Sequence, residues 1–352
     1  MKNIDPGMIS RLADIISKAS NIAIATHIHP DGDAMGSSIG LKHFLEESCG
    51  KTARIFLSDR WPDTLSFMMN ETEAGNIMVC DGNEERTAAC LQSCDTLFCL
   101  DFNTPSRSGS LQGPIENFTG EKILIDHHIG PDADCFSLCF SEIEISSASE
   151  YLYHILKRLE CPSGLPAATL DAILTGITTD TNNFANSVFP STLEACSELL
   201  AAGVDRDRIL GHIYNDYREN RMRLMGHLLK DVMVTTSAGL AYIILSKEDV
   251  GKYGITDGET EGFVNLPLAI KEIRMSVFLR EEDGYFRVSI RSKRGVSANR
   301  CAREHFNGGG HEQAAGGRLY WPKDISGPDA AAEYIENATA RFMQHDGPSK
   351  QI

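Results

Sequence analysis

A short apolar run that ends in three metal-competent side chains constrains this chain more than any other feature. Lys122-Ile123-Leu124-Ile125 runs directly into Asp126-His127-His128. Buried parallel strands have short, continuous hydrophobic runs of this kind, because both faces of their sheet are covered. In open α/β sheets, ligands bind beyond the carboxyl ends of the strands. The run therefore predicts a buried strand that delivers carboxylate and imidazole groups to a ligand site.

Three further apolar runs lead into polar clusters in the same way, and we interpret each as a strand end. They are residues 22–25 before the cluster 26–33, residues 96–100 before Asp101, and residues 172–177 before Thr178-Thr179-Asp180. Each cluster alone is as well or better explained as a turn or a helix cap. Their joint occurrence at four strand ends favours a metal site.

The length of the chain and its cysteines predict a cytoplasmic protein of two domains. The 352 residues exceed the size at which one hydrophobic core usually stops growing. No apolar stretch approaches the ~18 residues of a membrane span, and the N-terminus lacks a signal-peptide pattern. The ten cysteines have no regular spacing, which predicts reduced thiols without disulfides.

The charge of the chain limits the substrates that it can take. It has 33 basic and 49 acidic residues, a net charge of -16. Affinity for long nucleic acid comes mainly from Lys and Arg that neutralise phosphates, so broad binding of long nucleic acid is excluded. A short phosphorylated substrate is compatible, because its positive counter-charge can be local.

The order of the apolar patterns predicts an α/β fold with a mainly parallel sheet in the first half of the chain. Helices are expected over residues 8–20, 35–47 and 146–159, and further strands over residues 53–57 and 76–79. Residues 167–174 resemble a helix, but a buried helix and a buried strand are hard to separate there.

The pattern of apolar residues changes twice in the second half of the chain. Residues 191–235 are expected to be almost wholly helical, with a break near Gly203, and the patterns after Leu240 are strand-like. The expected strands cover residues 240–245, 275–280 and 286–292, and the expected helices residues 262–270 and 297–306. We therefore predict a metal-binding catalytic domain over 1–190, a helical connector over 191–235, and a smaller α/β substrate-binding domain with a mixed sheet over 236–345.

A glycine-rich segment, residues 308–317, lies in the second domain. Its glycines allow a ligand to approach the backbone closely, and the residues that follow can open a helix whose N-terminus binds an anion. A glycine-rich turn is by itself more often only a tight connection. The segment is nevertheless the only obvious anion cradle in the sequence.

The residue types in the four clusters select the metal chemistry. Imidazole together with carboxylates suits Mn, Fe, Co or Zn, whereas a site made only of oxygens favours Mg or Ca. A pair of ions about 3.5–4 Å apart can activate a shared water and clamp both oxygens of a phosphoryl displacement. Six candidate ligands for such a pair are His27, Asp31, Asp33, Asp101, His127 and Asp180.

These motifs resemble those of the DHH phosphoesterases, which are named for the triplet seen here as Asp126-His127-His128. Residues 27–37, Leu100-Asp101 and residues 176–181 match the other motifs of the family, and residues 308–316 resemble the DHH-associated domain. The resemblance covers nearly the whole chain in the expected order. It implies a two-domain phosphoesterase with a dinuclear centre that prefers Mn, with Mg or Co as alternatives.

The resemblance also implies roles for the residues of the first domain. The six candidate ligands would hold the ions, with Asp101 as the bridge. Asp126 would orient a neighbouring ligand. His128 would face the scissile phosphate, either as a hydrogen-bond donor or as the acid that protonates the leaving group.

Substrate contacts are implied on both domains. Arg291 would bind a phosphate or a base, and His311 with the backbone of Gly309 and Gly310 would hold the far end of the substrate. Arg107 would add a further contact. Residues 182–186 depart from the family, which often has glycine and then a basic residue after the phenylalanine; Ala185 stands there in this chain.

The resemblance is closest to the nanoRNase group, which comprises bifunctional oligoribonucleases and 3'-phosphoadenosine 5'-phosphate phosphatases. The expected partners are short RNA or small phosphorylated nucleotides, without long nucleic acid or a membrane, and a homodimer is compatible with the family. The alternatives are a RecJ-type exonuclease of single-stranded DNA, an exopolyphosphatase or pyrophosphatase, and a phosphodiesterase of cyclic or linear dinucleotides. A non-catalytic nucleotide-binding regulator would have lost metal ligands, and none of the six is missing.

Overall fold

The computed structural model describes residues 4–159, 164–256 and 258–345, which form two compact units. The first unit is Met1–Asp216 and the second is Tyr217–Ile352. The predicted connector, residues 191–235, is helical in most of its length, but the division falls inside it, so that its first part belongs to the first unit and its last part to the second. The three-part division of the chain stays a prediction.

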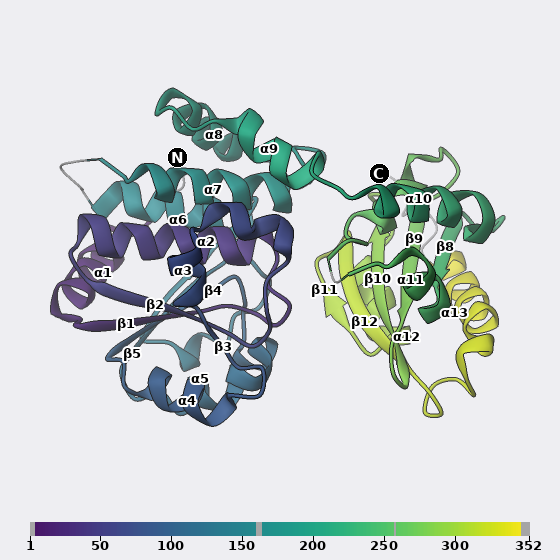
Figure 1. The fold of residues 1–352 in the computed structure, drawn as a ribbon, viewed down its shortest axis with the longest axis horizontal. Helices are drawn as coiled ribbons and strands as arrows, with labels where there is room; N and C mark the ends of the chain where they lie inside the picture. Colours follow the sequence, from purple (N-terminus) through teal and green to yellow (C-terminus); the bar gives the residue numbers. More distant parts are fainter. Residues whose placement is uncertain (1–3, 160–163, 257, 346–352) are drawn as a thin grey trace. The chain divides into compact units, whose positions relative to one another are not determined.

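The first unit is an α/β domain with a parallel sheet of six strands, as the apolar runs predict (Figure 1). The strand order is β3-β2-β1-β4-β5-β6, and every neighbouring pair is parallel. The strands are β1 (Asn21–Ala25), β2 (Thr52–Leu57), β3 (Met78–Val79), β4 (Thr96–Leu100), β5 (Glu121–Asp126) and β6 (Leu138–Ser141). The order reverses between β1 and β4, and such a switch point is where doubly wound sheets bind ligands.

Helices cover both faces of this sheet, which explains why its strands are apolar at every position. Ile123 and Ile125 belong to one hydrophobic core, and Leu124 between them belongs to another. In Figure 1, α2, α6 and α7 lie on one side of the sheet and α4 and α5 on the other. The helices are α1 (Pro6–Lys18), α2 (Gly32–His43), α3 (Glu71–Gly75), α4 (Glu84–Gln92), α5 (Gln112–Glu116), α6 (Ala148–Leu156), α7 (Ala167–Asp180), α8 (Pro190–Ala201) and α9 (Arg206–Tyr214).

Shorter helical segments complete the first unit. A π-helix, η1 (Phe44–Ser48), extends α2. The 3-10 segments are η2 (Asp63–Met68), η3 (Pro105–Leu111), η4 (Ala133–Cys135) and η5 (Lys157–Leu159). The expected helices over residues 35–47 and 146–159 are therefore α2 with η1, and α6 with η5.

Asp180 lies at the end of a helix, and its prediction as a strand end is wrong. The apolar run before it, residues 172–177, lies within α7, where every one of these residues is buried. A helix that is buried all round is apolar all round, and its sequence then resembles a buried strand. The helical reading of residues 167–174 is the correct one.

Two glycines let α2 and α7 pack closely. A Cβ atom at Gly36 of α2 would lie 2.6 Å from the carbonyl oxygen of Ala172 in α7, and a Cβ at Gly176 of α7 would lie 2.0 Å from Ser149 Oγ in α6 and 2.9 Å from Asp33 Oδ1 in α2. Neither position has room for a side chain. This contact brings the end of α7, and so Asp180, toward the start of α2.

The second unit contains a mixed sheet of six strands in the order β11-β12-β10-β9-β8-β7. Among the strands of the described residues, only β8 and β9 are parallel neighbours. The strands are β7 (Val234–Thr235), β8 (Leu240–Leu245), β9 (Met275–Glu281), β10 (Tyr285–Ser292), β11 (Gly309–Gly310) and β12 (Ala314–Tyr320). Its helical segments are α10 (Glu219–His227), η6 (Leu228–Val232), α11 (Lys247–Tyr253), η7 (Phe263–Ala269), α12 (Ala298–His305), η8 (Pro328–Ala330) and α13 (Ala331–His345).

Two expectations for the second unit need correction. Within the expected helix 262–270, Phe263–Ala269 form a 3-10 helix, in which Pro267 lacks the N–H that an α-helix uses. The residues after Gly310 do not open a helix: His311 and Ala314 close a tight turn by mutual backbone hydrogen bonds of 2.7 and 3.3 Å, and β12 follows. The glycine-rich segment is therefore a hairpin and not a helix N-terminus.

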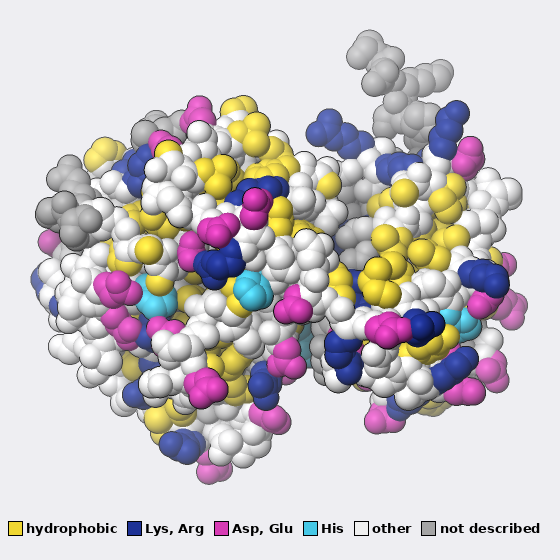
Figure 2. Space-filling model, turned by 45° about the horizontal axis from the view of Figure 1, so that its top comes forward, with side chains coloured by type: hydrophobic (Ala, Val, Ile, Leu, Met, Phe, Trp, Pro, Cys, Tyr) yellow, Lys and Arg dark blue, Asp and Glu magenta, His cyan; other side chains and the backbone are white. Residues whose placement is uncertain are grey.

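The described cysteines are all free thiols; Cys161 lies outside the described residues. Among the described helices, none is both long enough and apolar enough to cross a bilayer. Acidic and basic side chains are interspersed over the face of the molecule shown in Figure 2.

Candidate metal centre

The side chains predicted to bind metal meet at the switch point of the parallel sheet. His27 follows β1 and Asp101 follows β4, and these two strands are neighbours in the sheet. His127 follows β5, which pairs with β4 on its other side. The carboxyl ends of parallel strands share one edge of the sheet, so residues that are up to 100 positions apart in sequence lie side by side.

Among the described residues, three groups of possible ligand atoms contain Asp101; one of them joins it to Asp126 and His128, and the other two consist of candidate ligands alone. His27, Asp31 and Asp101 make the first group, and Asp33, Asp101 and His127 make the second. His27 Nε2 lies 3.4 Å from Asp101 Oδ2, whereas His127 Nε2 lies 3.3 Å from Asp101 Oδ1. The two oxygens of one carboxylate therefore face different groups.

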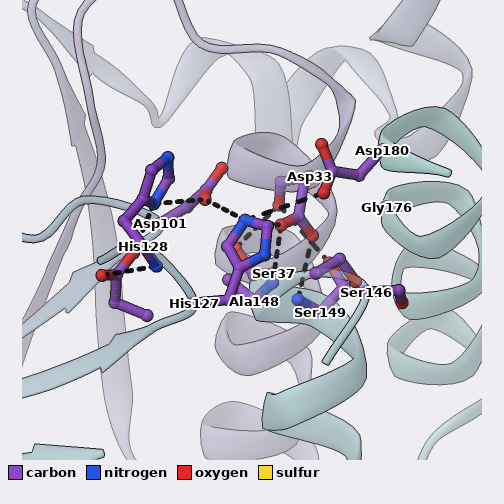
Figure 3. Close-up of polar contacts among 12 residues, drawn as sticks. Asp33, Ser37, Asp101, His127, His128, Ser146, Ala148, Ser149, Gly176 and Asp180 are labelled. Atoms are coloured by element: carbon purple, nitrogen blue, oxygen red, sulfur yellow. Dashed lines mark hydrogen bonds and ion pairs between the residues drawn. The ribbon is translucent and has the colours of Figure 1, made fainter. Parts of the chain in front are cut away.

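Asp180 joins the second group from the end of α7. Its Oδ2 lies 3.6 Å from His127 Nε2, and Asp33 Oδ2 lies 3.9 Å from the same nitrogen. Figure 3 shows the His127 ring between Asp101, Asp33 and Asp180. All six candidate ligands are thus within one site.

The hydrogen bond of His27 orients its ring. Nδ1 lies 2.8 Å from the carbonyl oxygen of Ile28, which can only accept, so Nδ1 carries the proton. Nε2 is then left as the nitrogen that faces Asp31 and Asp101. This tautomer is the one in which Nε2 can coordinate a metal ion.

Asp31 and Asp33 occupy the start of α2. Asp31 is the N-cap, and its Oδ1 accepts the backbone N–H groups of Asp33 at 3.0 Å and Ala34 at 3.1 Å. Gly32 between them has no room for a side chain, because a Cβ there would lie 2.3 Å from Thr179 Oγ1. The Pro-Asp-Gly-Asp sequence is therefore a helix start and not a free surface turn.

The N-terminus of α6 holds Asp33, which the sequence analysis did not foresee. The backbone N–H groups of Ala148 and Ser149 donate to Asp33 Oδ2 at 2.7 Å and to Oδ1 at 2.9 Å (Figure 3). The helix itself was expected over residues 146–159, and the spacing Ser147-x-x-Glu150 marks its start, because Ser147 is the N-cap and accepts the N–H of Glu150. The positive end of a helix dipole thus faces a candidate ligand.

Glu150 is a fully buried carboxylate that fixes this helix start. It accepts hydrogen bonds from the Ser146 backbone N–H at 3.1 Å, from Ser146 Oγ and from Thr192 Oγ1 at 2.7 Å. These contacts tie α6 to α8. The position of Asp33 therefore depends on a polar network that extends away from the site.

The pKa shifts of these groups reflect the concentration of negative charge in the site. Burial, followed by the charges of Asp101 and Asp180, raises the pKa of Asp33 well above its usual value. Burial by itself lowers the pKa of His127, but its contact with Asp101 and the charges of Asp180 and Asp33 raise it to about 10. Without a cation, the clustered carboxylates therefore favour the protonated forms of Asp33 and His127.

Asp101 itself stays ionised. Burial raises its pKa, but the contacts with His127 and His27 outweigh burial and hold the pKa well below the usual value. Its Oδ1 is buried and accepts no hydrogen bond among the described residues. Buried carboxylates are normally paired or bound to metal. An oxygen of this kind, among imidazole and carboxylate donors, fits a divalent cation of the Mn, Fe, Co or Zn type.

Asp126 contacts His128 with both of its oxygens. His128 Nδ1 lies 2.7 Å from Asp126 Oδ1, and the His128 backbone N–H donates to Oδ2 at 3.0 Å. Burial comes first among the causes that lower the pKa of His128, and the charge of Arg107 adds to it. His128 is therefore mainly neutral at pH 7 and oriented by Asp126.

Arg107 lies on the side of the first unit that carries the candidate metal centre. It lies in η3, and its carbonyl oxygen accepts the backbone N–H of Ile28 at 2.8 Å. That bond ties the Arg107 segment to the loop that carries His27. Its charge is close enough to lower the pKa of His128.

The remaining predicted site residues belong to the second unit. Arg291 is on β10, with Nη1 donating to the carbonyl oxygen of Ile290 at 3.0 Å. Gly309 and Gly310 form β11, and His311 begins the turn to β12. A Cβ at Gly309 would be in ordinary van der Waals contact with Asn299 Oδ1 at 3.6 Å, whereas a Cβ at Gly310 would lie 2.6 Å from the carbonyl oxygen of Ala314. Gly310 is thus required by the hairpin itself.

Comparisons with known proteins agree with this architecture. Residues 21–177 match the DHH family, N-terminal domain, and residues 237–339 match the DHHA1 domain. The chain is 35% identical to a bifunctional oligoribonuclease and PAP phosphatase NrnA of Thermus thermophilus over 85% of this chain and 84% of that protein. It is 30% identical to the NrnA protein of the same description from Bacillus subtilis, over 89% of this chain and 94% of that protein.

A solved structure resembles the whole chain. It is an exopolyphosphatase-related protein from Bacteroides fragilis, with a TM-score of 0.90 and 35% sequence identity. The match covers 98% of this chain and 99% of that chain. With both domain matches in order and the acidic and imidazole groups clustered for divalent metal, the chain belongs to the DHH family of phosphoesterases and is a hydrolase of phosphoester bonds.

Proposed function

We propose that this enzyme hydrolyses short oligoribonucleotides to mononucleotides and removes a terminal phosphate from 3'-phosphoadenosine 5'-phosphate. The observation that carries the proposal is the pair of ligand groups that share Asp101 at the sheet switch point. The relatives at 30% and 35% identity, whose names give these two activities, support it.

Two divalent metal ions, with Mn preferred over Mg or Co, are the proposed cofactors. His27 and Asp31 would hold one ion and Asp33, His127 and Asp180 the other, with Asp101 between them. When bound, such ions supply Lewis acidity toward the phosphoryl oxygens and lower the pKa of water. The N–H groups of Ala148 and Ser149 would keep Asp33 oriented as a ligand.

His128 and Asp126 are the proposed catalytic pair beside the metals. Asp126 accepts from Nδ1 of His128, so Nε2 is the atom that turns to the substrate. With Nδ1 donating to Asp126, Nε2 can donate a hydrogen bond to a phosphoryl oxygen or pass a proton to the leaving oxygen only when the ring carries a second proton, which the negative charge of a bound phosphate favours. Arg107 would neutralise a phosphate next to His128.

The second unit would bind the rest of the substrate. Arg291 would pair with a phosphate or a base, and His311 with the backbone of Gly309 and Gly310 would hold the substrate end away from the reacting phosphate.

A panel of substrates in Mn tests the proposal. We expect hydrolysis of 3'-phosphoadenosine 5'-phosphate and of RNA, with the rate per end highest at about two to five nucleotides, because the acidic chain offers little counter-charge to further phosphates. A ladder of RNAs up to about 24 nucleotides, read under single-turnover conditions, measures this preference. Equal or faster degradation of the longest RNA would favour a processive exonuclease.

Inorganic polyphosphate is the second candidate substrate, because the solved structure with a TM-score of 0.90 is described as exopolyphosphatase-related. Polyphosphate and pyrophosphate therefore belong in the same panel, beside cyclic and linear dinucleotides. Faster release of phosphate from polyphosphate than from RNA would replace the proposed function with this one.

A further inference from the structure

One face of the second sheet carries exposed arginines and partly exposed tyrosines along β10 and β12. Side chains alternate along a strand, and in β10 the positions Phe286, Val288 and Ile290 belong to the hydrophobic core. The positions between them therefore point to the opposite face. We call this side of β10 and β12 the outer strip; its cross-strand pairs are Tyr285 with Tyr320, Arg287 with Arg318, Ser289 with Gly316, and Arg291 with Ala314.

Three arginines stand side by side across the strip and the neighbouring strand. Arg287 is directly opposite Arg318 on β12 and directly opposite Arg280 on β9. Like charges that face each other across strands are destabilising. Arg287 and Arg318 are exposed, and Arg280 lies 3.4 Å from Glu282. In a chain of net charge -16, such a row is a local concentration of positive charge that an anion would stabilise.

A pair of aromatic rings adjoins the arginines. Tyr285 and Tyr320 have ring centroids 5.7 Å apart, and the Arg318 guanidinium lies 5.4 Å from the Tyr285 centroid. Both rings are partly exposed. Arginines that bind phosphates, beside aromatic rings on which bases stack, are the combination with which sheet surfaces bind single-stranded nucleic acid.

The middle of the strip has only small side chains, which leaves room for a ligand. Ser289 and Gly316 are the next cross-strand pair, and neither has a bulky side chain. The other half of the same face is not open, because Ile243 of β8 and Phe278 of β9 are buried in a core with Phe263 of η7. The accessible surface is thus a strip about two strands wide.

The strip leads away from the residues proposed to hold the substrate. Arg291 is at one end, paired with Ala314, whose carbonyl oxygen accepts the backbone N–H of His311. Tyr285 is at the other end, six residues or about 20 Å along β10. Arg287 is about 13 Å from Arg291 along the strand, too far for both to bind the same phosphate.

We propose that the outer strip binds the part of an oligoribonucleotide that lies beyond the nucleotide held at Arg291 and His311. Phosphates of that part pair with Arg287 and Arg318, and a base stacks on the Tyr285 and Tyr320 rings. This rests on the proposed function, since it extends the same substrate site to further nucleotides. The strip then selects RNAs of a few nucleotides, whereas 3'-phosphoadenosine 5'-phosphate is too small to reach it.

Kinetics of charge and ring variants in the full-length protein test the strip. Arg287→Gln and Tyr285→Leu should each lower kcat/KM for pentaadenylate about fivefold, with 3'-phosphoadenosine 5'-phosphate within about twofold of wild type. Arg223→Gln is the matched control, because Arg223 is an exposed arginine of the same unit that pairs with Glu219 on α10. This control variant should leave kcat/KM unchanged for both pentaadenylate and 3'-phosphoadenosine 5'-phosphate.

The salt dependence of binding separates contact from a structural effect. For fluorescein-labelled pentaadenylate in Ca²⁺, the slope of log Kd against log salt should fall by about 0.7 in Arg287→Gln, the value for one lost phosphate on a single strand. Tyr285→Leu should weaken binding at every salt concentration without changing this slope. A structural role would not change the slope in the arginine variant alone.

Three outcomes would overturn the proposal. Equal losses for pentaadenylate and 3'-phosphoadenosine 5'-phosphate would show general damage, and wild-type kinetics in both variants would show that the strip binds no RNA. If Arg287→Gln lowers kcat/KM for inorganic polyphosphate while Tyr285→Leu leaves kcat/KM for pentaadenylate unchanged, the strip binds polyphosphate and not RNA. If the wild-type enzyme cleaves no RNA of any length, it is the proposed function that fails.

Discussion

Asp126 holds His128 with both of its carboxylate oxygens, one on the ring nitrogen Nδ1 at 2.7 Å and one on the backbone N–H at 3.0 Å. The two residues are separated by a single position, and the geometry fixes both the tautomer and the direction of the ring. The middle residue of the triplet, His127, points into the carboxylate cluster (Figure 3). The three residues of the triplet thus have different surroundings.

The first prediction concerns this pair. Asp126→Asn should lower kcat about 10- to 100-fold while leaving bound Mn unchanged, because an amide cannot anchor the ring as a carboxylate does. Measuring kcat together with the metal content of the purified variant checks it. Loss of metal from the variant would instead make Asp126 a ligand.

The second prediction concerns the shared carboxylate. Asp101→Ala should abolish hydrolysis, because both ligand groups contain Asp101. Free Mn at about 100 times its Kd should stabilise the wild-type protein by about 2.7 kcal/mol per site, and the variant much less. Thermal unfolding with and without Mn or a chelator measures the difference. Near-normal turnover with full metal occupancy would contradict the assignment.

The third prediction concerns the hairpin of the second unit. His311→Ala should weaken hydrolysis of a dinucleotide while metal content stays intact, since its proposed contacts are with substrate only. Metal analysis and steady-state kinetics on the same preparation check both parts. Wild-type cleavage of the dinucleotide, or loss of metal, would show that the residue has a different role.

The fourth prediction concerns the packing of α2 against α7. Gly36→Ala should lower the free energy of unfolding by about 1–3 kcal/mol, because the new methyl group would meet the Ala172 carbonyl oxygen. Gly211→Ala in α9 is the control: nothing lies within 4 Å of its Cβ position, so it should stabilise by about 0.5–1 kcal/mol. Urea unfolding of the two variants gives both values, and equal effects would contradict the close contact.

The fifth prediction concerns pH and the ion pair between Arg218 and Glu259. The Arg218 guanidinium first, and then hydrogen bonds from Thr256, lower the pKa of Glu259 from its usual value to about 2. A depressed carboxyl pKa stabilises the fold fully above the unfolded pKa, and that stability is lost as pH falls through the folded pKa. Glu259→Gln should therefore lower the free energy of unfolding at pH 5 to 7, with the difference from wild type shrinking below about pH 4.5. Urea unfolding across this range checks it, and a constant difference would show that charge is not its cause.

The strands could be predicted from the sequence because burial on both faces gives each of them a continuous apolar run. Continuous apolar runs predict strands that are covered on both faces, and Ile123 and Leu124 do face different cores. The same pattern failed at Asp180, since α7 is buried all round and lacks the polar stripe of an exposed helix. Its end reaches the site because Gly36 and Gly176 let α7 approach α2 and α6 closely.

The sequence by itself determined the fold class, the order of the motifs and the choice of the six candidate ligands, because these depend on local patterns. The rule that parallel strands end at one edge accounts for His27, Asp101 and His127 but not for Asp180, which ends a helix. Only the tertiary structure decided which atoms face each other: that Asp101 turns one oxygen to His27 and the other to His127, and that the start of α6 holds Asp33. It also decided that Arg280, Arg287 and Arg318 are cross-strand neighbours on three adjacent strands. Strand register and helix packing bring together residues far apart in sequence, and no local pattern carries that information.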